Sequence, residues 1–447
     1  MFRYTQSQLK WIEVILVERI HNDIWLDNTV EDYILIKIKN RALSINIKSN
    51  YSFLTATHSD LPFSNWLIDE GWNGVLDEFV PAPGYSELEN PLINKKDSGY
   101  EISYDILGLL FWALSRLEEV NCGDLDKYDR FPASSSHALK HGYLERPIVD
   151  EWLSILSQVM QRVWPDIQLK QHQFCMKVSH DVDIPSRYLF QNWHGILRRM
   201  MADIIKRGDL IGALRAPRIY LKSHKELPKN DPMNTFEWIM DQSDKYNLTS
   251  AFYFICGKTD QLFDADYDIN HPVIRTLIRR IYKRKHEIGL HPSYNTYNSP
   301  DAIVAEANRL RDICAQVGVV QEKWGGRMHF LRWSQPITLY GWEAAGMEYD
   351  STLSYADHAG FRCGTCFEYP AFDPVAGMQL NLRIRPLIAM EVTIRDYMDL
   401  GLSKEAFDKF EQLKSACKSV NGVFTLLWHN NQLITKKSRD LYSSLLE

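Results

Sequence analysis

The sequence predicts an α/β fold whose C-terminal part is built on a parallel sheet or barrel. From about residue 170 onward, short apolar segments alternate with segments of helical length, which is typical of parallel strands joined by crossover helices. Several apolar segments end in His or Asp, and parallel α/β folds collect functional side chains at the carboxyl ends of their strands. The 447 residues also exceed what one hydrophobic core usually holds, so we expect a second domain.

Residues 1–168 are expected to form a smaller α+β domain, to which the sequence assigns no activity. Apolar spacing and alternation predict its elements, which are helices at residues 9–20, 105–117 and 148–163 and strands at residues 33–39 and 43–47. The first helix places Trp11 and Ile15 on one side, and Pro165 ends the last helix.

Residues 169–447 carry the alternation of strands and helices. The predicted strands lie at residues 174–179, 249–256, 286–291, 382–392 and 423–429, and the predicted helices at residues 235–246, 271–284, 299–317, 336–345 and 404–420. The third of these helices has the clearest start, because Ser299 can cap it and Pro300 suits its first turn.

The composition bounds the partners and the compartment. A net charge of −6 gives no reason to expect nucleic acid, and no stretch approaches the roughly 18 uncharged apolar residues of a transmembrane helix. The amino terminus lacks the pattern of a secretory signal, and together with seven cysteines this favours a reducing cytoplasm. Cys363-Gly-Thr-Cys366 is either a redox pair or, as we favour, two incidental thiols.

Residues 187–230 form a basic, insertion-like stretch between the first two predicted strands of this part. Trp193, Leu197 and Met201 stand at helical spacing beside Arg198 and Arg199. One interpretation is a flap that contacts a phosphorylated substrate or makes weak peripheral contact with an anionic membrane. The other, which we favour, is a solvated helical excursion that packs by one face.

The strand at residues 174–179 leads into His180, Asp181 and Asp183. Alternation along an extended strand places Asp181 and Asp183 on one face. Two carboxylates so close cannot both be ionised cheaply without a cation or strong donors. One carboxylate acting as a base and the other as a metal ligand would resolve this, and a solvated turn is the alternative, because Asp before Ile-Pro is common in turns.

Two further strands end in a histidine. Pro292 ends the strand before it at His291, and a neutral imidazole is a normal zinc ligand. His429 follows Trp428 at the end of the last strand, where it suits a general acid. Each histidine alone is more often structural, but three strands ending in this way in one domain favour a shared site.

Arg327-Met-His329-Phe-Leu-Arg332-Trp333 is a weaker cluster. Two arginines and a histidine at the end of a strand can orient a carboxylate. The aromatic content of 12% either lines a carbohydrate cleft, because rings stack on sugar faces, or belongs to an ordinary core.

Over residues 170–447 the clusters together resemble the polysaccharide deacetylase superfamily, the group of carbohydrate esterase family 4. The resemblance rests on segments that occur in the order of the family's motifs, which are Asp181-Val-Asp183, His286-Glu-Ile-Gly with His291, Gly346-Met-Glu-Tyr-Asp350-Ser-Thr and Leu427-Trp-His429. It implies a distorted (β/α) barrel, a divalent metal ion, with zinc expected, and hydrolysis of an N-acyl group on an amino sugar. Residues 1–168 resemble an uncharacterised domain that precedes such domains in bacteria.

The resemblance also implies roles for single residues. Asp181 would be the catalytic base, Asp183 and His291 would bind the metal, and His429 would protonate the leaving amine. Arg327 or Arg332 would orient the base.

The third metal ligand and the substrate contacts have less specific signals. Asn295 stands where the family has its second metal histidine, and an amide is a poor zinc ligand. The third ligand is therefore open between Asn295 itself, His180 and His329. His329, Trp333 and Trp428 are expected to contact the substrate.

The resemblance implies a first hypothesis, a cytoplasmic metal-dependent deacylase acting on a carbohydrate or sugar-nucleotide in bacterial surface-polysaccharide biosynthesis. The departure at Asn295 motivates a second, in which the fold is catalytically silent and binds carbohydrate or acts as a scaffold. A third is hydrolysis of another non-peptide C–N bond.

Overall fold

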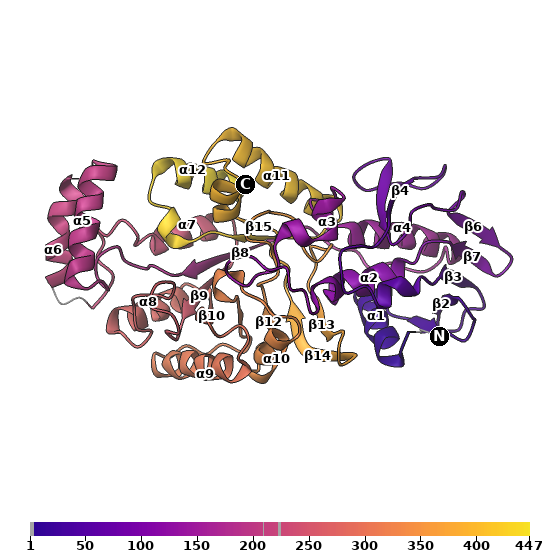
Figure 1. The fold of residues 1–447 in the computed structure, drawn as a ribbon, viewed down its shortest axis with the longest axis horizontal. Coiled ribbons are helices and arrows are strands. Elements are labelled where there is room, and N and C mark those ends of the chain that lie inside the picture. The colour runs from indigo at the N-terminus through magenta and orange to yellow at the C-terminus, as the bar shows by residue number, and fades with distance from the viewer. Residues whose placement is uncertain (1–3, 209, 222–224) are drawn as a thin grey trace.

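A computed structural model of the chain describes residues 4–208, 210–221 and 225–447, and the side chains of Lys206, Arg207 and Arg215 are outside that description. The molecule is elongated, with the N-terminal region at one end, a helical hairpin at the other and a large sheet between them (Figure 1). The fold is of the α/β class, as the sequence predicts.

The large sheet has nine strands in the order β13-β14-β12-β11-β10-β9-β8-β16-β15. All neighbouring pairs are parallel except β13 with β14. The strands are β8 (Cys175–Val182), β9 (Ser250–Ile255), β10 (Glu287–His291), β11 (Gly325–Gly326), β12 (Tyr349–Asp350), β13 (Tyr369–Asp373), β14 (Met378–Ile384), β15 (Ala389–Met390) and β16 (Val423–Leu427). Central β9 is buried along its whole length, as expected for a parallel strand covered on both faces.

Helices that lie between the strands or, for the last one, after them cover the sheet. They are α7 (Phe236–Lys245), α8 (Pro272–Lys283), α9 (Pro300–Gln316), α10 (Ile337–Ala344), α11 (Lys404–Ser419) and α12 (Lys436–Leu445). In α8 the buried residues include Ile274, Leu277, Ile278 and Ile281, whose spacing makes one apolar stripe towards the sheet. The predicted helices of this part exist, with boundaries that differ by a few residues, and so do four of the five predicted strands. The expected single strand at residues 382–392 is wrong, because it is divided between the end of β14 and the separate β15, with Pro386, which cannot donate to a ladder, between them.

The sheet does not close into a barrel by strand pairing within the described ranges. Strands β13 and β15 are its two edges. The β13–β14 pair is antiparallel, and α1 (Gln6–Arg19) packs against it, with the Trp11 indole donating to the Pro370 carbonyl at 2.8 Å. The expected (β/α) barrel is therefore seen as an open, mostly parallel sheet whose β13 side is occupied by the N-terminal region.

The N-terminal region has its own five-stranded sheet in the order β1-β2-β3-β7-β6. Its strands are β1 (Ile24–Asp27), β2 (Tyr33–Ile38), β3 (Ser44–Lys48), β6 (Ile93–Lys96) and β7 (Gly99–Ile102), and a separate pair joins β4 (Phe63–Leu67) to β5 (Phe79–Pro83). The predicted helices appear as α1, α2 (Ile106–Leu114) and α4 (Ile148–Val163). Short α3 (His137–Lys140) lies between the last two.

A buried ionic network joins the N-terminal region to the large sheet's loops. Glu119 accepts from Arg362 at 2.9 and 2.6 Å and from Arg116 at 2.8 Å. All three side chains are almost fully buried, so removing one partner would leave an uncompensated charge. The two regions therefore share a fixed interface, and the division at residue 168 is the domain boundary that we propose.

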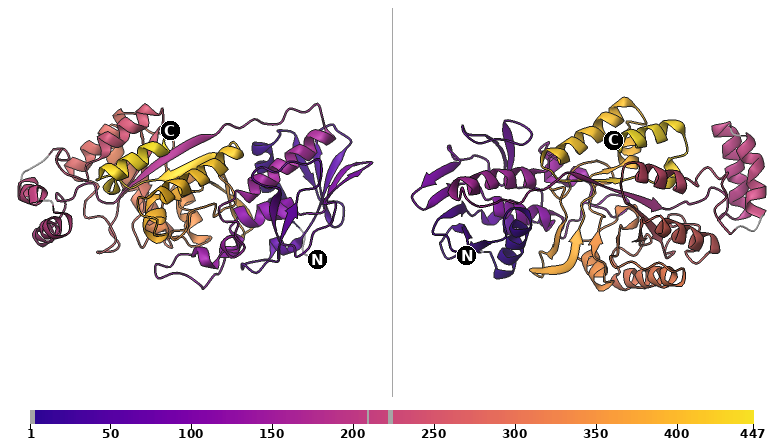
Figure 2. Two further views of the ribbon diagram at one scale, coloured as in Figure 1. Left: turned by 90° about the horizontal axis from the view of Figure 1, so that it is seen from above. Right: turned by 180° about the vertical axis from the view of Figure 1, so that it is seen from behind.

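The basic stretch contains two helices, α5 (Trp193–Arg207) and α6 (Leu210–Leu221), which lie side by side at the far end of the molecule (Figures 1 and 2). Positions 209 and 222–224 of that stretch lie outside the described residues. Among the helices that are described, none is both long enough and apolar enough to cross a bilayer.

Candidate active site

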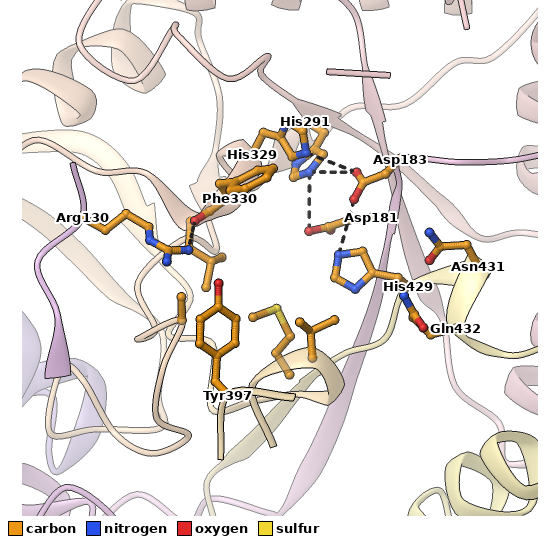
Figure 3. A pocket seen from close by; sticks show the side chains of 14 residues that line it. Arg130, Asp181, Asp183, His291, His329, Phe330, Tyr397, His429, Asn431 and Gln432 are labelled. Carbon is orange, nitrogen blue, oxygen red and sulfur yellow. Dashed lines mark hydrogen bonds and ion pairs between the residues drawn. The ribbon is translucent and has the colours of Figure 1, made fainter. Parts of the chain in front are cut away.

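The candidate site lies at the carboxyl edge of the large sheet. Asp181 and Asp183 come from the end of β8, His291 ends β10, and His429 follows β16. Because β16, β8, β9 and β10 are parallel neighbours, these strand ends meet at one edge of the sheet. Figure 3 shows the side chains converging on one cavity, together with His329.

Asp183, His291 and His329 form a group that could hold a metal ion, with ligand atoms within 4.8 Å of one another. Asp183 Oδ1 lies 3.4 Å from His291 Nε2 and 3.8 Å from His329 Nε2. Ligands bound to zinc at about 2.0–2.1 Å in a tetrahedron lie about 3.3–3.4 Å apart. The spacing of the three donors therefore fits a small divalent cation.

The surroundings orient both imidazoles towards that point. His291 Nδ1 lies 2.6 Å from the Arg327 carbonyl oxygen, which can only accept, so Nδ1 carries a proton, and Nε2 is the nitrogen whose lone pair the neutral ring offers to a metal ion. His329 Nδ1 lies 3.2 Å from Asp264 Oδ1. Such partners are typical of histidines that bind metal ions.

Asp183 Oδ1 is buried and has no hydrogen-bond partner among the described residues. Burial by itself would raise the pKa of Asp183, but the neighbouring His329, His291 and His429 lower it overall. An ionised carboxylate with one buried oxygen beside two imidazole nitrogens is a donor set that suits zinc. The site thus fits the metal implied by the sequence, with His329 as the third donor.

Asp181 is held beside this group by Arg327. Arg327 Nη1 donates to Asp181 Oδ1 at 2.7 Å, and the same guanidinium donates to the Ser351 carbonyl at 2.9 Å and to Ser179 Oγ at 2.9 Å. The guanidinium is fully buried, so its position is fixed by these bonds. The other Asp181 oxygen, Oδ2, lies 3.7 Å from His291 Nε2 and faces the cavity.

His429 forms the opposite side of the site with Glu391. Its Nδ1 lies 2.6 Å from Glu391 Oε1, and its Nε2 lies 3.6 Å from Asp183 Oδ2. Burial would lower the pKa of His429, but the Glu391 carboxylate and then Asp183 and Asp181 raise it to about 10. His429 therefore carries a proton that it can donate into the cavity.

The cavity has a volume of about 190 Å³ and two unlike walls. One wall carries the carboxylates and imidazoles of Asp181, Asp183, His291, His329 and His429. The other wall is apolar and consists of Leu331, Ala356, Met390 and Val392. Arg130 and Tyr397 line the part of the cavity away from the carboxylates (Figure 3). The other lining residues are Phe330, Asn431 and Gln432. Arg130 is the one lining residue that comes from the N-terminal region.

The loop that carries His329 has an unusual backbone. Phe330 and Leu331 have φ values of 61° and 56°, in the left-handed region that costs side-chain-bearing residues roughly 1–2 kcal/mol each. The N-terminal region holds this loop at two points. Arg130 Nη1 donates to the Phe330 carbonyl at 3.0 Å, and Arg332 Nε donates to the Tyr128 carbonyl at 2.9 Å.

Two predicted metal ligands lie elsewhere. His180 is on the opposite face of β8 from Asp181, where its Nδ1 lies 2.6 Å from the Trp428 carbonyl and burial lowers its pKa to about 3. Asn295 is exposed, its oxygen accepts from Arg332 at 3.0 Å, and its nitrogen donates to the Thr259 carbonyl. The structure therefore brings neither side chain to the metal group.

Three other predicted residues also serve the scaffold. Arg332 contacts Asp129 at 2.6 Å rather than Asp181, so Arg327 is the arginine beside Asp181. Trp428 is buried on the helix side of the sheet between Phe410 and Tyr442, because it precedes inward-facing His429 and alternation turns it outward. Trp333 is buried, and its indole donates to Gln335. Neither tryptophan lines the cavity.

Sequence reasoning missed Asp264, Glu391, Arg130 and Tyr397. Glu391 directly follows the buried pair of β15, so an acid at an apolar strand end was a usable signal. Asp264 belongs to an irregular loop and reaches His329 only through the fold. No local pattern marks Arg130 or Tyr397 either.

Comparisons with known proteins give a partial match and distant structural likenesses. The model of a family of unknown function, DUF7033, matches residues 3–165. No curated protein matches the chain. The structure is similar to that of a polysaccharide deacetylase from Mycobacterium smegmatis, with 16% identity, a TM-score of 0.40 and coverage of 63% of this chain and 84% of the other. It is also similar to Puue allantoinase, with 11% identity, a TM-score of 0.35 and coverage of 62% and 83%.

Proposed function

We propose that the protein is a metal-dependent hydrolase that removes an N-acyl group from an amino sugar. The observation that carries the proposal is the grouping, in one cavity, of a donor trio for a cation, an arginine-held carboxylate and a carboxylate-held histidine. Buried partners orient each of the three parts of that grouping. Such fixed orientation is a requirement of catalytic sites.

The residues divide the work of amide hydrolysis. A cation held by Asp183, His291 and His329 would polarise the acyl carbonyl and lower the pKa of a water. Asp181 takes the proton of the water whose oxygen adds to the acyl carbon, and Arg327 fixes its orientation. His429 donates its proton to the nitrogen as the C–N bond breaks, and Glu391 stabilises its protonated form. The products are a carboxylate and a free amine.

The sugar, the compartment and the pathway rest on the sequence resemblance. The cavity offers a polar wall for the reacting amide and an apolar wall for the remainder of the acyl group or sugar. We propose a carbohydrate or sugar-nucleotide substrate in bacterial surface-polysaccharide biosynthesis, with the reaction in the cytoplasm.

The test is an assay of acetate or formate release from a panel of N-acylated amino sugars, with protein loaded with zinc, cobalt or manganese. Asp181→Asn is expected to reduce the rate by about 10²–10⁴-fold, the usual contribution of a general base, and to retain the metal. Asp183→Asn is expected to lose the metal. Full activity of Asp181→Asn would contradict the assignment of the base.

Two alternatives are outcomes of the same experiment. Release from cyclic amides or ureides, but not from sugars, would indicate hydrolysis of another C–N bond. Protein that holds no stoichiometric metal and releases nothing from any substrate would indicate a silent carbohydrate-binding or scaffolding protein. The hypothesis of a silent protein rests on Asn295, where the family has a metal histidine. His329 argues against it, because it places a third donor in the group.

A further inference from the structure

The α5–α6 hairpin exposes an unusual amount of apolar side chain. Ile205 and Leu214 are each 79% exposed. The other exposed large apolar residues of the hairpin are Trp193, Leu197, Met201, Ile204, Leu210, Ile211 and Leu221. In α5, Trp193, Leu197 and Met201 follow one another at intervals of four, so they form a stripe along one side of the helix.

The exposed residues are not the ones that hold the hairpin together. The two helices pack through Ile196, Ala216 and Ile219, which are buried with Tyr188 in a small separate core. A helix with a second apolar side beyond its packing side normally buries that side against something else. In this chain the second side of both helices faces outward.

Polar contacts anchor the hairpin to the rest of the molecule. Arg187 pairs with Asp203, and Arg199 lies 3.6 Å from Asp266 in the body of the protein. The hairpin lies at the end of the molecule opposite to the N-terminal region (Figure 2), so its exposed side can reach a large flat surface.

The charge of the hairpin is opposite to that of the whole chain. Residues 193–221 contain six basic and two acidic residues, a net charge of +4, whereas the chain has a net charge of −6. Arg198 and Arg218 are exposed among the apolar residues. Basic residues beside apolar ones, with Trp193 at the start of the helix, are typical of helices that lie in the interface of an anionic membrane.

We propose that the α5–α6 hairpin docks the protein on the surface of an anionic lipid membrane. The hairpin would lie in the headgroup region rather than cross it, since α5 has 15 residues and spans about 22 Å, less than the roughly 30 Å of a hydrocarbon core. A second copy of the chain is a poorer occupant, because two hairpins with a charge of +4 would repel each other. The proposal does not depend on the proposed hydrolase activity.

The experiment is co-sedimentation of the full chain with two kinds of vesicle, one of phosphatidylcholine alone and one with phosphatidylglycerol added. We expect binding to the second kind that weakens as salt is raised. The double variant Ile205→Glu/Leu214→Glu is expected to lower the partition coefficient at least about tenfold, because it removes two apolar side chains from the side that would be buried in the membrane. Arg198→Gln and Arg218→Gln are each expected to lower it about fivefold.

The control is Leu262→Glu, which adds one of the two negative charges of the double variant at a residue that is 87% exposed and outside the hairpin. It should bind like the unmodified chain, and circular dichroism should show that all variants are folded. Absence of binding to anionic vesicles, or equal loss in Leu262→Glu, would overturn the proposal. A dimer in solution that Ile205→Glu/Leu214→Glu converts to a monomer, without vesicle binding, would assign the surface to a second copy instead.

Discussion

The two halves of the candidate metal group are held by different means. Asp183 and His291 stand at the ends of β8 and β10, whose pairing with β9 and β11 fixes their direction. His329 stands in a loop with two left-handed residues after it, and that loop is held by hydrogen bonds with residues of the N-terminal region, one donated by Arg130 and one accepted by the Tyr128 carbonyl. We call the first the strand half and the second the loop half.

The loop half of this small site depends on a part of the chain that is distant in sequence. In the strand half, the pleat and the sheet hydrogen bonds dictate where a side chain points. In the loop half, Arg130 and Tyr128 are about 200 residues away from the atoms that they hold. Strained backbone persists only where its surroundings enforce it, so the N-terminal region is expected to contribute to the metal site without touching the ion.

The largest effect is expected from removing a donor in either half. His291→Ala and His329→Ala should each lower metal affinity by more than about 100-fold, because losing a ligand costs more than losing its outer-shell partner. The measurement is metal content after dialysis, with affinity determined by competition with a chelator. If His329→Ala kept the affinity of the unmodified chain, the loop half would not belong to the metal group.

His180→Asn is the matched control for this comparison. This variant removes an imidazole too, but one near the end of β8 on the face opposite to Asp181. There the His180 side chain contacts Trp428 and Tyr442. We expect lower thermal stability and unchanged metal content. Loss of metal in folded His180→Asn would show that this histidine, rather than His329, completes the donor set.

The next largest effect is expected from Asp264, the partner of the loop histidine. Asp264→Asn should lower metal affinity by about 10–100-fold, the usual cost of losing an outer-shell carboxylate. The neutral amide would accept a weaker hydrogen bond from His329 Nδ1 and would hold the ring less firmly. Asp266→Asn, two residues away and partly exposed, is the control and should leave the affinity unchanged.

The strand half is also the half that the sequence could predict. Apolar strands that end in Asp181, Asp183, His291 or His429 are visible as local patterns, and pairing of parallel strands brings their ends together. Trp428 and His180 each directly precede a residue that points into the site, so alternation along the strand turns both side chains away from the cavity. The sequence became decisive on this point only once the strand ends were placed. The open sheet could not be foreseen, because the packing of α1 on the β13–β14 pair joins segments more than 300 residues apart.

The loop half shows where sequence reasoning stops. His329 was predicted to contact substrate or to supply the third ligand, and only the fold distinguishes these roles. Its orientation depends on Asp264, on two left-handed residues and on Arg130. None of these has a periodic pattern, and each contact spans more sequence than a local motif can encode.

A smaller effect is expected when the support from the N-terminal region is weakened. Arg130→Met removes the hydrogen bond to the Phe330 carbonyl and should lower metal affinity about fivefold, the equivalent of one hydrogen bond of about 1 kcal/mol. Lys127→Met removes a charge from the same segment at an exposed position and should have no effect. Equal affinities for both variants would mean that the loop keeps its conformation without this support.

The smallest effect is expected at Asn295, the position where the sequence suggests a metal ligand. Its oxygen accepts from Arg332, its nitrogen donates to Thr259, and its side chain is exposed. Asn295→Ala should therefore change metal affinity by less than about twofold, since exposed hydrogen bonds contribute little. Isothermal titration with zinc, done beside His329→Ala, would measure this directly. A loss at Asn295→Ala as large as that at His329→Ala would place the third ligand back at position 295 and remove the distinction between the two halves.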